Sequence, residues 1–212
     1  MLDTATLLLY LVTDSSLAAG RELPDIVREA VRGGCTMVQL REKNGSTRDF
    51  IEKARSLKQV LAGTGVPLII NDRIDIALAV DADGVHIGQS DMPYADARRL
   101  LGSNKIIGLS VESMADIDIA NTLDVDYIGL SPIFSTPTKH DTATPFGLSG
   151  AREGVQRSVH PCVAIGGIHL NNIADVMQTG VKGVAVVSEI MAADHPYEAA
   201  RNLIQTLRHE TL

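Results

Sequence analysis

The sequence predicts a single (β/α)₈ TIM barrel, and three observations support this prediction. Short apolar runs alternate with amphipathic segments, as they do in parallel βαβ units. The alternation repeats eight times, which is the number of units in this barrel. The length of 212 residues suits one domain with short loops, and no low-complexity linker divides residues 1–212.

The expected strands are the eight apolar runs, in chain order. They are residues 7–14, 37–43, 67–72, 84–88, 106–111, 126–133, 161–168 and 183–190. The segments between them have apolar residues at intervals of three and four and often end in glycine, which predicts helices. Examples are residues 23–34, 49–63, 171–180 and 196–207, and a short helix is expected from Arg73 to Val80. A doubly wound sheet is the alternative, although no G-x-G-x-x-G follows the first run.

Composition limits the class of protein. The formal net charge is −7, and the basic residues form no stripe of the kind that sequence-independent nucleic-acid binding needs. We therefore expect no nucleic-acid partner, while a few local cations can still bind an anionic ligand. No apolar stretch reaches the ~18 residues of a membrane span and no signal-peptide pattern is visible, which predicts a cytoplasmic protein without a membrane partner. Cys35 and Cys162 are expected to be buried, reduced thiols.

The second expected strand carries polar residues toward the barrel mouth, where active sites of this fold form. Side chains alternate across a strand, so Gln39, Arg41 and Lys43 share the lumen face, and Val38 and Leu40 share the face under the helices. Two cations on a buried face are costly unless an anion accompanies them. We interpret them as an anion-binding row; a structural ion pair inside the barrel, with Glu42 or an aspartate at a strand end, is the alternative.

Two carboxylates follow neighbouring strands. Asn71 and Asp72 end the third run, and Asp91 lies in the loop after the fourth. Mg²⁺ takes one or two carboxylates and shares substrate phosphates, so the pair predicts a magnesium site. Taken singly, Asp72 could be a helix N-cap and Asp91 a turn residue. Ser110, at the end of the fifth run, is expected to contact a ligand.

The last two strands indicate a second anion site. Barrels frequently bind phosphate with the loops after strands seven and eight, through backbone N–H groups. Gly166 and Gly167 follow the seventh run, where glycine permits close approach, and Ser188 follows the eighth.

An irregular stretch, residues 131–147, follows the sixth run. Thr136 and Thr138 supply hydroxyl groups and Lys139 supplies a charge, so we interpret the stretch as an active-site lid over an anionic ligand. A solvated insertion is the alternative. His86 alternates with apolar neighbours, which predicts a hydrogen-bonded histidine facing the lumen.

Five segments together resemble the thiamine-phosphate synthase family, also called thiamin-phosphate pyrophosphorylases. They are VQLREK (38–43), INDRIDIA (70–77), DGVHIGQSD (83–91), PIFSTPTK (132–139) and VAIGGI (163–168). The matches run from YLVTD (10–14) to VAVVSEI (184–190), so the resemblance covers nearly the whole chain. Ser131 stands before Pro132 where we expect the family to have glycine, which affects only the backbone at the start of the lid.

The resemblance implies a transferase that joins 4-amino-2-methyl-5-hydroxymethylpyrimidine diphosphate to 4-methyl-5-(2-hydroxyethyl)thiazole phosphate. The products are thiamine phosphate and pyrophosphate. The implied contacts to the diphosphate substrate are Gln39, Leu40, Arg41, Glu42, Lys43, Asn71, Ser110 and Lys139. The implied contacts to the thiazole phosphate are Thr136, Pro137, Thr138, Gly167, Val187 and Ser188. Asp72 and Asp91 would hold one Mg²⁺ per subunit.

The resemblance also implies a dissociative reaction. The carbon–oxygen bond of the diphosphate breaks first, and the thiazole nitrogen attacks the pyrimidine-methyl cation. Mg²⁺, Arg41, Lys43 and Lys139 would stabilise the departing charge, with Ser110 completing the catalytic set.

Two rival functions follow from the same barrel. A thiazole tautomerase is expected to lack the Gln-Arg-Lys row and the paired aspartates, and a non-catalytic binder of thiazole phosphate has no need of a metal pair. The sequence leaves the oligomeric state open, a homo-oligomer included.

Overall fold

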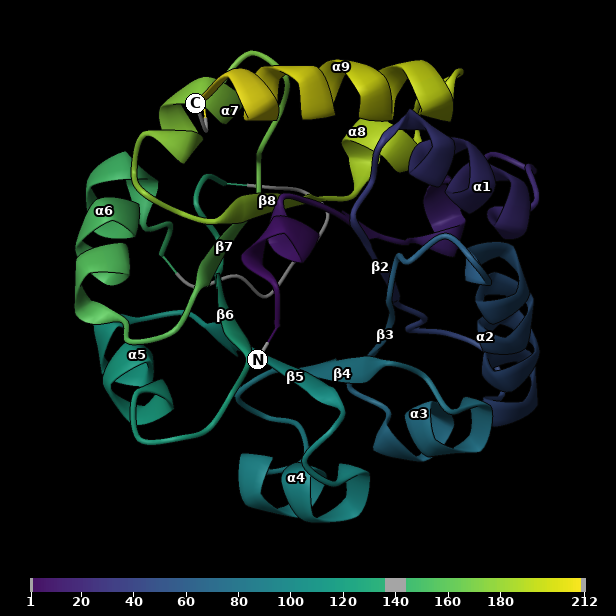
Figure 1. Ribbon diagram of the computed structural model, residues 1–212, viewed down its shortest axis with the longest axis horizontal. Helices are drawn as coiled ribbons and strands as arrows, with labels where there is room; N and C mark the ends of the chain where they lie inside the picture. The colour runs from purple at the N-terminus through teal and green to yellow at the C-terminus, as the bar shows by residue number, and fades with distance from the viewer. Residues whose placement is uncertain (1, 136–143, 211–212) are drawn as a thin grey trace.

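The computed structural model describes residues 2–135 and 144–210, and these form a closed barrel of eight parallel strands in chain order. The (β/α)₈ prediction is confirmed, and Figure 1 shows the helices surrounding the strands. The strands are β1 (Leu9–Val12), β2 (Met37–Leu40), β3 (Leu68–Asn71), β4 (Gly84–Ile87), β5 (Ile106–Val111), β6 (Tyr127–Leu130), β7 (Cys162–Ile165) and β8 (Gly183–Val186).

Helices follow every strand in the described part of the chain. They are α1 (Leu23–Gly33), α2 (Thr47–Leu61), α3 (Ile74–Val80), α4 (Tyr94–Leu101), α5 (Met114–Ala120), α6 (Gly147–Arg157), α7 (Ile173–Met177), α8 (Ser188–Met191) and α9 (Pro196–Glu210). Helix α2 begins two residues before the expected position, because Ser46 and Asp49 form a capping box at its start. None of the described helices is long and apolar enough to cross a membrane.

Several expected strands are longer than the strands observed. The first apolar run begins at Leu7, but residues Thr4–Leu7 form a 3₁₀ helix and β1 begins at Leu9. The Leu7 side chain is fully buried against the lumen residues, so this turn closes the bottom of the barrel. At the other end, the polar residues after β2 leave the sheet and form the mouth.

Strand alternation divides the buried side chains into two clusters. The larger cluster lies between the strands and the helices and includes Val38 and Leu40, as predicted. The smaller cluster fills the lumen with Leu7, Tyr10, Val12, Met37, Ile69, Tyr127, Val163 and Ala185. The lumen is therefore a packed core, which leaves the mouth as the place for ligands. Cys35 and Cys162 are buried free thiols.

Candidate active site

The strongest feature of the mouth is a pair of contacting carboxyl groups after β3 and β4. Burial and a hydrogen bond and charge repulsion from Asp91 raise the pKa of the Asp72 carboxyl to about 7, against weaker lowering by Asn71 and Arg41. Asp91 also accepts a hydrogen bond from the Gly88 N–H at 2.7 Å. Two adjacent acids that repel one another suit a shared cation, since a cation removes the repulsion.

The backbone at Asp72 supports a role in the site. Its φ is +60°, in the left-handed region that residues other than glycine rarely adopt, and such geometry clusters at functional sites. The N-cap of α3 is Arg73, so Asp72 is not the cap that the simpler interpretation required. Asp91 does lie in a turn, with its N–H bonded to the Gly88 carbonyl at 3.3 Å, and this is compatible with metal binding.

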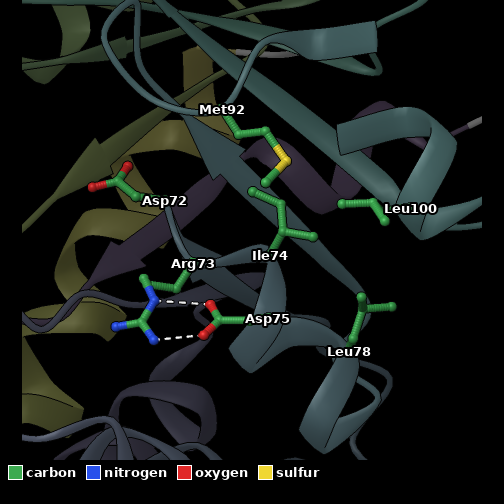
Figure 2. Close-up of a pocket in the computed structure, with 7 residues that line it drawn as sticks. All are labelled: Asp72, Arg73, Ile74, Asp75, Leu78, Met92 and Leu100. Carbon is green, nitrogen blue, oxygen red and sulfur yellow. Dashed lines mark hydrogen bonds and ion pairs between the residues drawn. The ribbon is translucent and has the colours of Figure 1, made fainter. Parts of the chain in front are cut away.

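A pocket of about 350 Å³ lies beside Asp72, between α3 and α4. Figure 2 shows its lining residues, which are Asp72, Arg73, Ile74, Asp75, Leu78, Met92 and Leu100. The Asp72 carboxyl points away from the apolar side chains of this pocket, and Arg73 is paired with Asp75 at 2.6 Å. The pocket therefore lies on the side of Asp72 away from its carboxyl group, and it was not expected from the sequence.

The structure shows only part of the anion-binding row that was predicted on and after β2. Gln39 is buried in the lumen, and its Nε2 donates to the Tyr10 hydroxyl at 2.7 Å. The Arg41 guanidinium lies 3.6 Å from the Asp14 carboxylate, so the ion pair weighed as the alternative also exists. That distance is long for a charged hydrogen bond, and an arriving phosphate can compete for the guanidinium. Lys43 is exposed.

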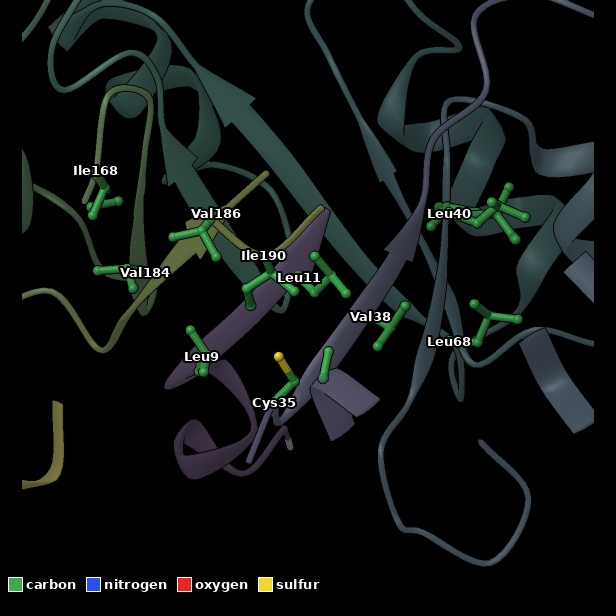
Figure 3. Packing of buried hydrophobic residues seen from close by; sticks show 14 of the residues in the cluster. Leu9, Leu11, Cys35, Val38, Leu40, Leu68, Ile168, Val184, Val186 and Ile190 are labelled. Atoms are coloured by element: carbon green, nitrogen blue, oxygen red, sulfur yellow. The ribbon is translucent and has the colours of Figure 1, made fainter. Parts of the chain in front are cut away.

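Two residues of the same segment face elsewhere. Leu40 lies in the outer core between strands and helices, where Figure 3 shows it with Val38 and Leu68. The Glu42 carboxylate pairs with Lys53 at 2.6 Å and accepts from the Ser15 hydroxyl. The predicted contacts from Leu40 and Glu42 to a substrate at the mouth therefore stay predictions. Because the Leu40 side chain is buried in the outer core, a contact from Leu40 would come from its backbone.

Ser110 and His86 meet at the ends of β5 and β4. The His86 Nε2 lies 2.8 Å from the Ser110 hydroxyl, and its Nδ1 lies 3.0 Å from the Tyr127 hydroxyl. The prediction of a hydrogen-bonded, lumen-facing histidine is confirmed. The Ser110 carbonyl accepts from Gln89 at 2.6 Å, which joins the loop after β4 to β5.

The glycines after β7 support the base of the predicted lid. Gly166 and Gly167 have φ of +101° and +63°, and a Cβ on Gly167 would lie 2.8 Å from the Phe134 Cβ. The N–H groups of Ile133 and Phe134 donate to the carbonyls of Ile165 and Gly166, at 2.8 and 3.0 Å. The loop after β6 is therefore fixed on the loop after β7, and only glycine allows this approach.

The far end of the lid is fixed to its beginning. Phe146 and Gly147 donate backbone hydrogen bonds to Pro132 and Ile133, both at 2.9 Å. The two ends of the stretch 131–147 therefore lie side by side at the barrel. Four predicted site residues within it lie outside the described residues: Thr136, Pro137, Thr138 and Lys139.

The remaining phosphate residues begin α8. Val187 is the N-cap of this helix and Ser188 its first residue, and both are half-buried at the mouth. Close by, His169 pairs with Glu189 at 2.6 Å, and the Asn172 amide donates to the Gly167 carbonyl at 2.9 Å. Neither of these contacts was expected from the sequence.

A model described as thiamine monophosphate synthase matches residues 9–190, which is most of the barrel. The chain belongs to this family. A thiamine-phosphate synthase of Albidiferax ferrireducens is 54% identical over 199 residues, covering 94% of this chain and 91% of that protein. One from Vibrio parahaemolyticus is 53% identical over 202 residues, covering 94% and 97%. As a member of the thiamine-phosphate synthase family, the chain is an enzyme of the transferase class.

Solved structures support both the family and the fold. The thiamine phosphate pyrophosphorylase of Pyrococcus furiosus has a TM-score of 0.90 with this chain, with 38% identity and 98% coverage of both. An orotidine 5'-phosphate decarboxylase from Pyrococcus horikoshii has a TM-score of 0.68 at 17% identity, and this likeness concerns the fold alone.

Sequence reasoning missed two participants in the lumen. Tyr10 and Tyr127 bond to Gln39 and His86. Strand alternation places both tyrosines on lumen faces, so the signal for them was present. Asp14 ends the first expected strand, and its contact with Arg41 is the ion pair with a strand-end aspartate that was weighed as the alternative.

Proposed function

We propose that the chain joins the hydroxymethylpyrimidine diphosphate to the hydroxyethylthiazole phosphate, giving thiamine phosphate and pyrophosphate. The observation that carries this proposal is the contact between the Asp72 and Asp91 carboxyl groups, beside Arg41, at the barrel mouth. Acids on one side and a guanidinium on the other match a metal–diphosphate complex, which presents a cation and several anionic oxygens. The relatives are named thiamine-phosphate synthases, which supports the same product.

The acidic residues would bind the metal ion, and the basic residues would bind the diphosphate. Bound between Asp72 and Asp91, one Mg²⁺ per subunit would neutralise charge on the leaving diphosphate. Arg41 and Lys43 would bind its outer oxygens, and Arg41 would exchange the Asp14 carboxylate for phosphate. These contacts would stabilise the charge that the diphosphate gains as the carbon–oxygen bond breaks, which favours loss of pyrophosphate before attack by the thiazole nitrogen.

The second substrate would occupy the loops after β7 and β8. Gly167, Val187 and Ser188 would bind its phosphate, mainly through backbone N–H groups. Thr136, Pro137, Thr138 and Lys139 would close over both substrates from the lid. The beginning of the lid is bonded to the loop after β7, and its far end is bonded to its beginning. The proposal includes a cytoplasmic location and no nucleic-acid partner.

The first test is synthesis itself. Purified protein is mixed with both precursors, with and without Mg²⁺, and thiamine phosphate is followed by chromatography. Mg²⁺-dependent product is the expected result. Isomerised thiazole phosphate without any thiamine phosphate would replace the proposal with the tautomerase function. Binding of thiazole phosphate without chemistry would replace it with the binder.

The second test separates metal binding from folding. Asp72→Asn is expected to raise the Mg²⁺ concentration for half-maximal rate by about tenfold or more, because one ligand oxygen loses its charge. Asp75→Asn is the matched control, since that carboxylate lies three residues away and pairs with Arg73 on the surface of α3. An Asp72→Asn protein with unchanged rate and unchanged Mg²⁺ dependence would remove Asp72 from the metal site.

A further inference from the structure

A chain of hydrogen bonds crosses the lumen and ends at the mouth. It runs from the Gln39 amide to the Tyr10 hydroxyl at 2.7 Å, then to the Tyr127 hydroxyl at 2.9 Å. From there it passes to His86 Nδ1 at 3.0 Å, and from His86 Nε2 to the Ser110 hydroxyl at 2.8 Å. Tyr10, Tyr127 and Gln39 are almost completely buried, so water does not substitute for these partners.

The barrel makes specific room for this chain. Gly108 on β5 lies in register with His86 on one side and Tyr127 on the other. A Cβ there would lie 2.6 Å from His86 Nδ1 and closer still to the Tyr127 phenol. The two rings meet over the glycine, with centroids 5.5 Å apart. The contact between tyrosine and histidine is thus built into the strand sequence.

The direction of the hydrogen bonds follows from counting protons. An amide nitrogen only donates, so the Tyr10 oxygen accepts from Gln39. Burial raises the pKa of both phenols, so each keeps one hydrogen. Among the described residues, Tyr127 is the remaining hydrogen-bond partner of Tyr10, so the Tyr10 hydrogen goes there; otherwise it would be buried without an acceptor.

The same count of hydrogens determines the direction of the remaining bonds, from Tyr127 to Ser110 at the mouth. Tyr127 accepts from Tyr10 and donates its own hydrogen to His86 Nδ1. A neutral imidazole with an accepting Nδ1 carries its hydrogen on Nε2. The Nε2–H then donates to the Ser110 oxygen, and the Ser110 hydrogen is left for a different acceptor.

We propose that Tyr127 and His86 are positioning residues that make Ser110 a hydrogen-bond donor toward an anionic substrate oxygen at the mouth. The identity of that oxygen as part of the diphosphate substrate rests on the proposed function. The direction of the hydrogen bonds does not rest on the proposed function. If the Gln39 amide had the opposite orientation, every bond would reverse, and Ser110 would donate to histidine instead.

Nuclear magnetic resonance of ¹⁵N-histidine-labelled protein tests the polarity directly, without substrate. In mildly alkaline buffer, where a free imidazole is neutral, the His86 Nδ1 signal is expected to be that of an acceptor nitrogen and Nε2 that of a protonated one. His86→Gln identifies the signals. The opposite tautomer in the wild-type protein would overturn the proposal, whatever the enzyme's activity.

Steady-state kinetics tests the consequence. Tyr127→Phe keeps the ring but removes the hydrogen donated to Nδ1, and we expect about a 3- to 10-fold fall in kcat/KM for the diphosphate substrate. The matched control is Tyr94→Phe, which removes a hydroxyl bonded to the Asp124 carbonyl outside the barrel, and its kcat/KM should not change.

A double-mutant cycle shows whether Tyr127 acts through Ser110. In a Ser110→Ala background, Tyr127→Phe is expected to have no further effect on kcat/KM. Full additivity of the two substitutions would overturn the role of Tyr127 as a positioning residue. Failure of the wild-type protein to make product would instead count against the proposed function, and the tautomer measurement would still decide the polarity.

Discussion

Replacement of Gly108 by alanine gives a sharp test of the lumen geometry. The added Cβ would lie 2.6 Å from His86 Nδ1, about 0.8 Å short of the 3.4 Å at which ordinary contact begins, and nearer still to Tyr127. Tyr127 is fully buried among the packed lumen residues. The ring must therefore give up its bonds to Tyr10 and His86, or the strands must separate.

The cost can be worked from these contacts. Overpacking of a core costs about 1–3 kcal/mol, and a buried hydrogen-bonding group left without a partner costs about 1–3 kcal/mol more. Alanine returns about 0.5–1 kcal/mol relative to glycine in a strand. We expect a net loss of about 3 kcal/mol in the free energy of unfolding. With a urea dependence of about 2–3 kcal/mol per molar, the unfolding midpoint should fall by about 1 M.

Gly129→Ala is the matched control. Gly129 lies on the next strand, and its added Cβ would approach the same histidine ring at 3.3 Å, a distance that a small shift relieves. Its midpoint should change by less than about 0.5 M, since the cost is within about 1 kcal/mol. Equal midpoints for the two variants, measured by urea titration of the circular dichroism signal, would refute the steric reasoning.

Three further predictions concern charge at the mouth. Asp91→Asn should raise the half-saturating Mg²⁺ concentration by about tenfold or more; an unchanged Mg²⁺ titration would contradict its role. Lys139→Ala should slow single-turnover product formation about 100-fold with an unchanged circular dichroism spectrum; an unchanged rate would remove this lysine from the site. Asp14→Asn should tighten pyrophosphate binding about 2- to 5-fold by calorimetry, because Arg41 loses a competing carboxylate 3.6 Å away. Weaker binding would mean that Asp14 orients Arg41 instead.

The fold was predictable because its signal is repeated. Eight apolar runs and their helices each give weak information, but one architecture explains them all. The errors lie at the ends of elements. The run beginning at Leu7 includes a 3₁₀ turn, and helix 171–180 is only Ile173–Met177, because apolar residues that pack below the sheet or in loops look the same as strand and helix residues.

The site was predictable where residues follow strand ends. Asp72, Asp91 and Ser110 could be placed together because parallel strands bring their carboxyl ends to one mouth. Glu42 shows the limit of this reasoning. It lies between Arg41 and Lys43 in the sequence, yet its carboxylate pairs with Lys53 on α2. After the strand ends, the direction of a side chain depends on partners that are distant in sequence, and periodicity carries no information about them.

The hydrogen-bond chain connects β2, which carries Arg41 at its end, with β5 on the other side of the two aspartates. Gln39 belongs to β2, on the side of Arg41, and Ser110 belongs to β5, beyond the two aspartates. A packed lumen could have been entirely apolar, and buried polar groups are tolerated only when all are satisfied. Among the described residues no buried side-chain nitrogen or oxygen lacks a partner. A fully satisfied chain of this kind has two arrangements, one for each orientation of the Gln39 amide. It therefore fixes the distance between Gln39 and Ser110, and the direction of every hydroxyl follows from one choice. The proposed reaction needs positioning and no protein nucleophile, and under that proposal this rigidity is the reason to keep two tyrosines and a histidine along the lumen.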